Sequence, residues 1–219
     1  QGKVEKVTRE DGSWTAYTYD AAGNRSSKTV YKEGTTTKTF YTRDAAGNIM
    51  AIYQSGKLQE QPIHGSGRIG QYLGNTKAGD RTLGNKTYEL SNHLGNVLTV
   101  ISDNKVGVDE SGDQMVDFYK NYIVSATDYY PFGLTMEERS YQAEDYRYGF
   151  NGAEKDNSIA DEGLDLGLRI YNPAIARMTA IDPRTSEYPW QSPYVYHRNS
   201  PVWKIDYLGG GDPIQEDRT

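Results

Sequence analysis

Residues 17–24 read Tyr-Thr-Tyr-Asp-Ala-Ala-Gly-Asn, and the pattern returns at residues 41–48 as Tyr-Thr-Arg-Asp-Ala-Ala-Gly-Asn. The two copies are 24 residues apart, and a shorter copy, Asn-His-Leu-Gly-Asn at residues 92–96, follows 48 residues after the second. A period of this length is typical of repeat architectures, in which each unit packs on its neighbours. The sequence therefore predicts an array before any single residue suggests a chemistry.

Each full copy is predicted to be a β-hairpin. Asp20 and Asp44 open four-residue segments that end in Gly23 and Gly47, which fits a type I turn closed by a glycine with positive φ, the G1 bulge. The flanking segments are rich in Thr, Tyr, Val and Ile: 14–19, 25–31, 39–42 and 49–53. Because such a hairpin cannot bury its own face, its stability must come from stacking on neighbouring units.

The composition favours an all-β chain with at most short helices. Only 36% of the 219 residues are apolar, but 19 are Tyr and 3 are Trp. A tyrosine can bury its ring while its hydroxyl stays hydrated or hydrogen-bonded, which suits thin sheets lined with rings. Helical patterns are limited to residues 137–145 and 173–178, and the polar residues 103–117 are predicted to form a loop.

Charge and composition exclude several functional classes. A net charge of −6 and a pI near 5.2 are not compatible with the basic face that nucleic acids require. The chain has no cysteine, which excludes disulfides, thiolate catalysis and cysteine-based zinc sites. The three histidines, His64, His93 and His197, are far apart in sequence, so we expect neither a metal nor a cofactor.

No apolar run approaches the roughly 18 residues that a membrane helix needs. The chain begins at Gln1 and carries no basic and apolar leader. We therefore expect a soluble piece of a longer polypeptide, without a membrane span.

Gly65-Ser-Gly-Arg-Ile-Gly70 matches the spacing of a dinucleotide-binding loop. That chemistry requires the glycines to open a helix within a β-α-β unit. Gly74 follows too soon for such a helix, and the neighbouring segments are strand-like, so a turn at the edge of the sheet is predicted instead.

A second set of motifs follows in the last third of the chain. They are Tyr148-Gly-Phe-Asn-Gly-Ala-Glu-Lys-Asp156, Gly167-Leu-Arg-Ile-Tyr-Asn-Pro173, Ala176-Arg-Met-Thr-Ala-Ile-Asp-Pro183, Tyr188-Pro-Trp-Gln-Ser-Pro-Tyr-Val-Tyr196, Asn199-Ser-Pro201 and Ile205-Asp206. Together with the repeats they resemble the RHS repeat-associated core domain of bacterial Rhs and YD-repeat proteins, and the resemblance covers nearly the whole chain.

The resemblance implies a fold and a division of the chain. In this family an antiparallel β ribbon of YD-repeat hairpins spirals into a hollow shell, which the core domain plugs. Residues 1–145 would be a segment of the shell, residues 146–210 the core plug, and residues 211–219 a linker towards a C-terminal segment. The expected partners are this protein's own C-terminal cargo and, beyond it, secretion machinery or other surface proteins, with the protein secreted or displayed on a bacterial surface.

The resemblance also implies a reaction. Many members release their C-terminal segment, often a toxin, by intramolecular aspartyl proteolysis that uses one arginine and two aspartates. By position within the matching motifs these are Arg169, Asp182 and Asp206. Two carboxyl groups that share a site hold one proton between them, and a nearby arginine favours the ionised partner and a developing oxyanion.

The cleavage signal departs from the family pattern. The family commonly reads Asp-Pro-x-Gly-Leu and is cut after the leucine, whereas residues 206–210 here read Asp-Tyr-Leu-Gly-Gly. The corresponding bond joins Gly210 to Gly211. Two structural alternatives stay open at this point: Arg169 simply pairs with a carboxylate in the plug, and Asp206 simply caps a turn. The alternative function is a scaffold without catalysis that binds proteins or glycans.

Overall fold

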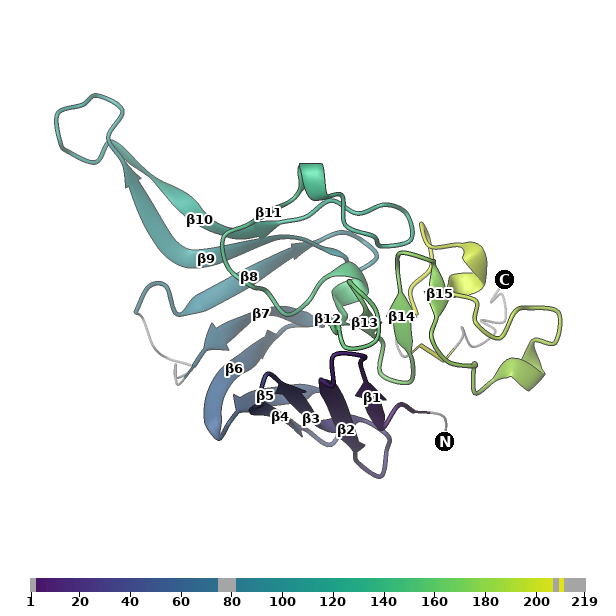
Figure 1. Cartoon of the computed structure of the whole chain (residues 1–219). Coiled ribbons are helices and arrows are strands. Elements are labelled where there is room, and N and C mark those ends of the chain that lie inside the picture. Colours follow the sequence, from purple (N-terminus) through teal and green to yellow (C-terminus); the bar gives the residue numbers. More distant parts are fainter. Residues whose placement is uncertain (1–2, 75–81, 207–208, 211–219) are drawn as a thin grey trace.

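The computed structural model describes residues 3–74, 82–206 and 209–210 (Figure 1). Within them the chain is all-β, as predicted, with an eleven-stranded antiparallel sheet followed by a four-stranded antiparallel sheet. The helical elements in this part of the chain are 3-10 turns of three residues. In both sheets each strand pairs with the next strand along the chain, so the fold grows by local steps.

The strands of the large sheet are, in order, β1 (Lys6–Thr8), β2 (Trp14–Tyr19), β3 (Arg25–Lys32), β4 (Thr35–Arg43), β5 (Ile49–Gln54), β6 (Lys57–His64), β7 (Arg68–Leu73), β8 (Lys86–Ser91), β9 (Val97–Val108), β10 (Phe118–Ala126) and β11 (Tyr141–Gln142). The strands of the small sheet are β12 (Glu154–Lys155), β13 (Leu164–Asp165), β14 (Ile170–Asn172) and β15 (Arg177–Met178). The 3-10 turns are η1 (Glu137–Arg139), η2 (Phe150–Gly152), η3 (Thr185–Glu187) and η4 (His197–Asn199).

The repeated motif forms the predicted turn. In residues 20–24, 44–48 and 92–96, the first N–H donates to the fifth carbonyl and the fourth N–H donates to the first carbonyl, at 2.9–3.1 Å. The glycines at the fourth position have φ values of +84°, +89° and +75°. The ladders on either side shift register at these turns, as a G1 bulge requires. All three turns join an even-numbered strand to the next, so they lie along one edge of the ribbon.

Three further turns share this hydrogen-bonding pattern without the aspartate or asparagine that marks the motif. They span residues 9–13, 130–134 and 149–153, and each has a glycine of positive φ at its fourth position. The glycine is thus common to all six turns, because it alone enters the left-handed region without steric cost. The Asp20 and Asp44 carboxylates add a bond of 2.8 Å to the N–H of Asn24 and of Asn48.

Three of the expected elements are different in the structure. Residues 173–178 do not form a helix: a turn with Ala176 at φ +54° leads into β15, which pairs with β14. Only η1 is helical within residues 137–145. The predicted loop at 103–117 is wrong for its first part, because β9 continues to Val108 and pairs with β10 as far as Phe118. Polar side chains are tolerated there because this hairpin projects beyond the body of the protein (Figure 1).

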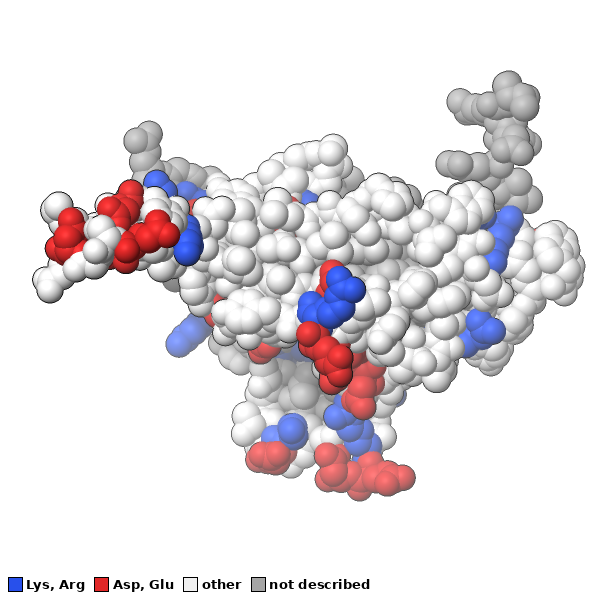
Figure 2. Space-filling model, turned by 90° about the horizontal axis from the view of Figure 1, so that it is seen from above, with Lys and Arg blue, Asp and Glu red and all other residues white. Residues whose placement is uncertain are grey.

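The projecting hairpin carries a concentrated negative charge. Figure 2 shows acidic side chains gathered at its tip, where Asp109, Glu110, Asp113 and Asp117 are exposed, while most of the same face of the molecule is uncharged. The first three residues of the glycine-rich motif at 65–70 form the turn between β6 and β7, as predicted, with the Gly65 N–H bound to the Gly67 carbonyl at 2.7 Å, and the other three begin β7.

The large sheet bends around residues 146–206, which we call the C-terminal lobe (Figure 1). The lobe has its own apolar core, in which the Tyr171 and Tyr196 rings stack with centroids 4.0 Å apart. A second cluster joins the lobe to the sheet and consists of Val97, Val100, Val124, Tyr146 and Tyr148. The tyrosine-rich composition thus supplies both the interior of the lobe and its contact with the sheet.

We expect Gly47→Ala to lower the free energy of unfolding by about 1–2 kcal/mol, because an alanine at φ +89° is strained although its Cβ has room, 3.7 Å from the Asn24 side chain. Gly67→Ala is the matched control: its φ is not positive and no atom lies within 4 Å of the added carbon, so stability should hold or rise slightly. Chemical denaturation of the two variants measures the difference, and equal losses would contradict the assignment of strain to the turn.

Candidate functional site

The tyrosines of the two full repeats point into the contact between the sheet and the lobe. Tyr17 and Tyr41 occupy the same position in their repeats, and their hydroxyls donate to Asp156 at 2.9 Å and to Glu154 at 2.7 Å. Glu154 and Asp156 are two residues apart along an extended segment, so their side chains emerge on one face. Two tyrosines that are one repeat apart on the sheet therefore bond to two carboxylates that are two residues apart in the lobe.

In the third repeat the roles are exchanged. Glu89 lies 48 residues after Tyr41, on the sheet, and accepts a bond of 2.5 Å from the hydroxyl of Tyr146 in the lobe. Arg68 pairs with the same carboxylate at 2.6 Å. The carboxylate has moved from the lobe to the sheet, and the tyrosine has moved the other way. The tyrosine–carboxylate bond is retained.

Basic side chains complete this buried layer. Arg25 lies 3.0 Å from both Asp156 and Asp165, and Lys28 lies 2.8 Å from Asp156. Burial acts to raise the pKa of Asp156, but the charges of Lys28 and Arg25 outweigh it and lower the pKa to about 2. Burial dominates at Asp165 and raises its pKa despite Arg25. The layer positions the lobe on the sheet.

Arg147 connects two acidic groups in the same layer. It pairs with Glu60 of β6 at 2.7 Å and with Glu154 at 3.1 Å. Burial is the largest influence on the pKa values of Tyr17 and Tyr41 and raises both, so their hydroxyls stay protonated and act as donors.

The acidic and basic members of this layer were not predicted from the sequence. The equivalent positions of Tyr17, Tyr41 and Glu89 were the available signal.

The three residues expected to act on the peptide bond come together in the C-terminal lobe. Arg169 stands just before β14 and is buried, with 3% of its surface exposed. Its Nη2 lies 2.8 Å from Oδ2 of Asp182, and its Nη1 donates to the Pro193 carbonyl at 3.2 Å. Burial lowers the pKa of Arg169, and the carboxylates of Asp182 and Asp206 oppose that shift. The guanidinium therefore interacts electrostatically with both aspartates.

Asp206 is linked to Arg169 through Gly209. Oδ1 of Asp206 accepts a bond of 2.5 Å from the Gly209 N–H, and the Gly209 carbonyl accepts a bond from Nε of Arg169. Both alternatives for these residues are present at once, since Arg169 pairs with a carboxylate and Asp206 holds a turn. Those contacts also bring the chain at Gly209 against the guanidinium.

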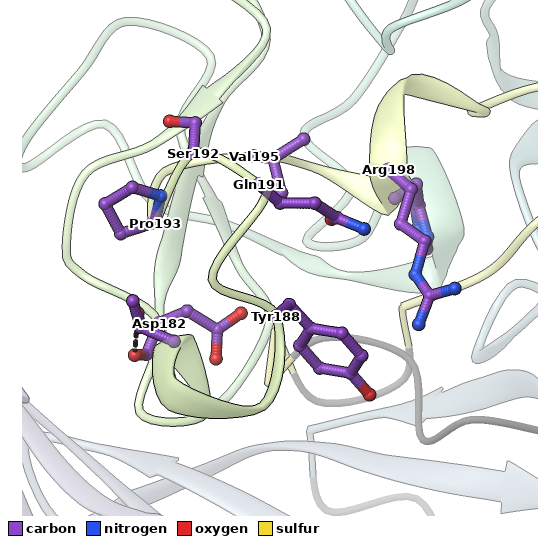
Figure 3. Close-up of a pocket in the computed structure, with 9 residues that line it drawn as sticks. Asp182, Tyr188, Gln191, Ser192, Pro193, Val195 and Arg198 are labelled. Carbon is purple, nitrogen blue, oxygen red and sulfur yellow. Dashed lines mark hydrogen bonds between the residues drawn. The ribbon is translucent and has the colours of Figure 1, made fainter.

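Gly210 is buried, and Gly211, on the other side of the expected scissile bond, lies outside the described residues. A cavity of about 20 Å³ lies beside Asp182 and is also lined by Tyr188, Gln191 and Arg198 (Figure 3). This volume is enough for one water molecule. Two hydrogen bonds hold Asp182 in position: its Oδ1 accepts from the Arg184 N–H at 2.8 Å, and its carbonyl accepts from the Thr185 hydroxyl at 2.6 Å.

The described part of the chain holds no group of three or more His, Asp or Glu side chains arranged to bind a metal ion. None of its helical elements has the length and apolar character to cross a membrane.

Comparison with known proteins gives a fold but no sequence family. No protein-family model and no curated protein matches the chain. Crystal structures of TcdB2–TccC3 match over 94% of this chain, one with Cdc42 at a TM-score of 0.66 and one without it at 0.64, both at 19% identity. The Photorhabdus luminescens Tc holotoxin pore with a substitution in TccC3 matches over 98%, at a TM-score of 0.66 and 19% identity.

The chain has an RHS-type shell fold. It spans about a tenth of the length of the solved chains that it matches, since the matched region is 10% of each. The expectation of a β ribbon of shell type is therefore confirmed.

We expect Asp156→Asn to flatten the acid limb of the stability curve. The folded pKa of Asp156, about 2, is below its reference value of 3.8, so its contribution is fully present above pH 4 and disappears as the pH falls towards 2. The difference between these two pKa values corresponds to a contribution of about 2 kcal/mol to the free energy of unfolding. Asp165, whose pKa is raised, contributes in the opposite sense and is common to both proteins.

Denaturant unfolding of this chain between pH 2 and 5 measures the effect. Asp113→Asn, at the tip of the projecting hairpin, is the control and should follow the wild-type curve. An unchanged slope in Asp156→Asn would show that Lys28 and Arg25 do not stabilise its carboxylate.

Proposed function

We propose that this chain forms and closes part of the shell of a longer RHS/YD-repeat protein that encloses a C-terminal effector or toxin. The RHS-type shell fold and the tenfold greater length of the matched chains support this role. Residues 146–210 would act as the plug and residues 211–219 would lead towards the cargo. The protein would act outside the bacterium that makes it, with the cargo as its main partner and secretion machinery or surface proteins as further ones.

The open sheet supports the proposed shell role. β1 pairs with β2 on one side only among the described strands, so its other edge can receive the preceding strand of a ribbon. The lobe is attached to the inner side of the sheet by the buried layer of tyrosines, carboxylates and basic groups. An attachment of this kind would let the lobe close a shell without a separate linker.

We further propose that the lobe cuts its own chain between Gly210 and Gly211. One observation carries this proposal: Arg169 contacts Asp182 directly and also binds the carbonyl of Gly209, one residue before the expected bond. Asp206 binds the N–H of the same glycine. The catalytic candidates therefore hold the substrate segment in place, and this positioning removes several kcal/mol from the barrier of an intramolecular reaction.

The proposed reaction is hydrolysis. One carboxylate of the pair takes a proton from a water molecule, whose oxygen attacks the carbonyl carbon of Gly210. The other carboxyl group donates a proton to the departing nitrogen of Gly211, and the carbon–nitrogen bond breaks. Gly210 ends as a carboxylate, and the amine of Gly211 takes up the proton that the new carboxylic acid releases and ends as an ammonium group. The small cavity beside Asp182 is large enough to hold a water molecule next to that carboxylate, and Arg169 would stabilise the developing oxyanion.

We expect Asp206→Asn and Asp182→Asn each to leave the full-length parent uncut, lowering the rate of cutting by at least 100-fold, because each variant removes one proton-transfer group while the fold survives. The intact mass of the purified parent measures this, with Asp113→Asn as a control that should be cut like the wild type. A wild-type parent with no fragment ending at Gly210 would exclude the reaction.

A second candidate is a scaffold without catalysis that binds proteins or glycans. It is favoured by the altered signal at residues 206–210 and by large aromatic side chains exposed on the lobe, with Trp190 and Trp203 showing 72% and 67% of their surface. The same mass measurement separates the candidates. Two species that co-purify support enclosure and release, and a single uncut species supports the scaffold.

A further inference from the structure

The segment before the proposed cut lies against the turn that joins β13 to β14. A Cβ added to Gly209 would be 3.0 Å from the Cβ of Leu166 and 3.2 Å from the backbone nitrogen of Arg169. Gly209 also has φ of +69° and is held at its N–H by Asp206 and at its carbonyl by Arg169. Backbone geometry therefore keeps any side chain out of position 209.

Position 210 is restricted in a different way. A Cβ added to Gly210 would lie 2.8 Å from Cδ1 of Leu168, closer than real Cβ contacts, and no other described atom is within 4 Å of it. The φ of Gly210 is not in the left-handed region. One leucine side chain, half-buried at the end of the same turn, thus occupies the space that a side chain at 210 would need.

We propose that Leu168 is the specificity-determining residue of the cleavage site. Its Cδ1 lies where a side chain on the carbonyl side of the cut bond would begin, so any such side chain must first displace the end of Leu168, and glycine is favoured. This inference rests on the proposed autoproteolysis between Gly210 and Gly211. Position 210 is glycine in this chain, whereas the cleavage signal of the RHS family has leucine there. In this chain Leu168 occupies the neighbouring space instead.

The effect of a mismatch follows from positioning. A larger residue at 210 must either displace the end of Leu168 or shift the segment that Arg169 and Asp206 hold at Gly209. A misplacement of about 1 Å costs roughly 100-fold in rate when reacting groups are held in place. Removal of the Leu168 side chain should create room for the larger residue without touching the carboxyl groups.

The test is a reciprocal exchange in the full-length parent protein. We expect Gly210→Leu to slow cutting by 10-fold to 100-fold and the double variant with Leu168→Ala to recover most of that loss, with Leu168→Ala alone measured as the reference for the double variant. The fraction cut over time is measured by intact mass, which also locates the new end. Gly67→Leu, at an open turn with no atom within 4 Å, is the control for introducing a leucine and should be cut normally.

A second readout does not depend on cutting. In an Asp182→Asn background that stays uncut, amide exchange at residue 209 should quicken with Gly210→Leu and slow again when Leu168→Ala is added, since the Asp206 bond to this amide needs the segment in place. Normal cutting of Gly210→Leu, or no recovery in the double variant, would overturn the role of Leu168. A wild-type parent that is not cut would instead overturn the proposed reaction, while the exchange data would still report the fit of the pair.

Discussion

The structure depends on one buried layer of carboxylates, between the inner side of the large sheet and the lobe. Asp156 is fully buried, and its charge is balanced by Arg25, Lys28 and the hydroxyl of Tyr17. Taking such a charge out of water costs several kcal/mol unless partners surround it, so one missing partner destabilises the whole contact. The layer therefore holds the lobe on the sheet through groups that depend on one another, since each carboxylate needs its basic partners to stay buried.

This placement also sets the position of the candidate site. The chain leaves the layer at Asp165, turns through residues 166–168 and enters β14 with Arg169 already buried. The same turn contacts Gly209 and Gly210 from the far end of the lobe. One short segment thus connects the contact with the sheet, the guanidinium that holds Asp182, and the wall beside the proposed cut. The two proposed roles of the lobe, closing the shell and cutting the chain, would both depend on this segment.

The turns and hairpins of this chain could be predicted from the sequence because they depend only on residues that are close together along the chain. An aspartate, a glycine three residues later and β-branched neighbours determine a bulged hairpin by steric limits on φ and by one side-chain bond, whatever surrounds them. Arg169, Asp182 and Asp206 were named from the motifs that resemble the RHS family, and their role in cutting stays a prediction. The helix expected at residues 173–178 was wrong because pairing with β14 outweighed a weak local preference, and the loop expected at 103–117 was partly wrong because pairing with β10 extends β9.

By itself the sequence determined the all-β class, the turns and the 24-residue step that places Tyr17 and Tyr41 on one face. Only the tertiary structure decided which groups those tyrosines meet, that Glu89 takes the equivalent place with its partner exchanged, and that Leu168 lies beside Gly210. The physical reason is the range of the interactions. Turn geometry depends on atoms a few bonds apart, whereas pairing of buried charges and steric exclusion join residues 40 to 140 positions apart, and no local pattern records that proximity.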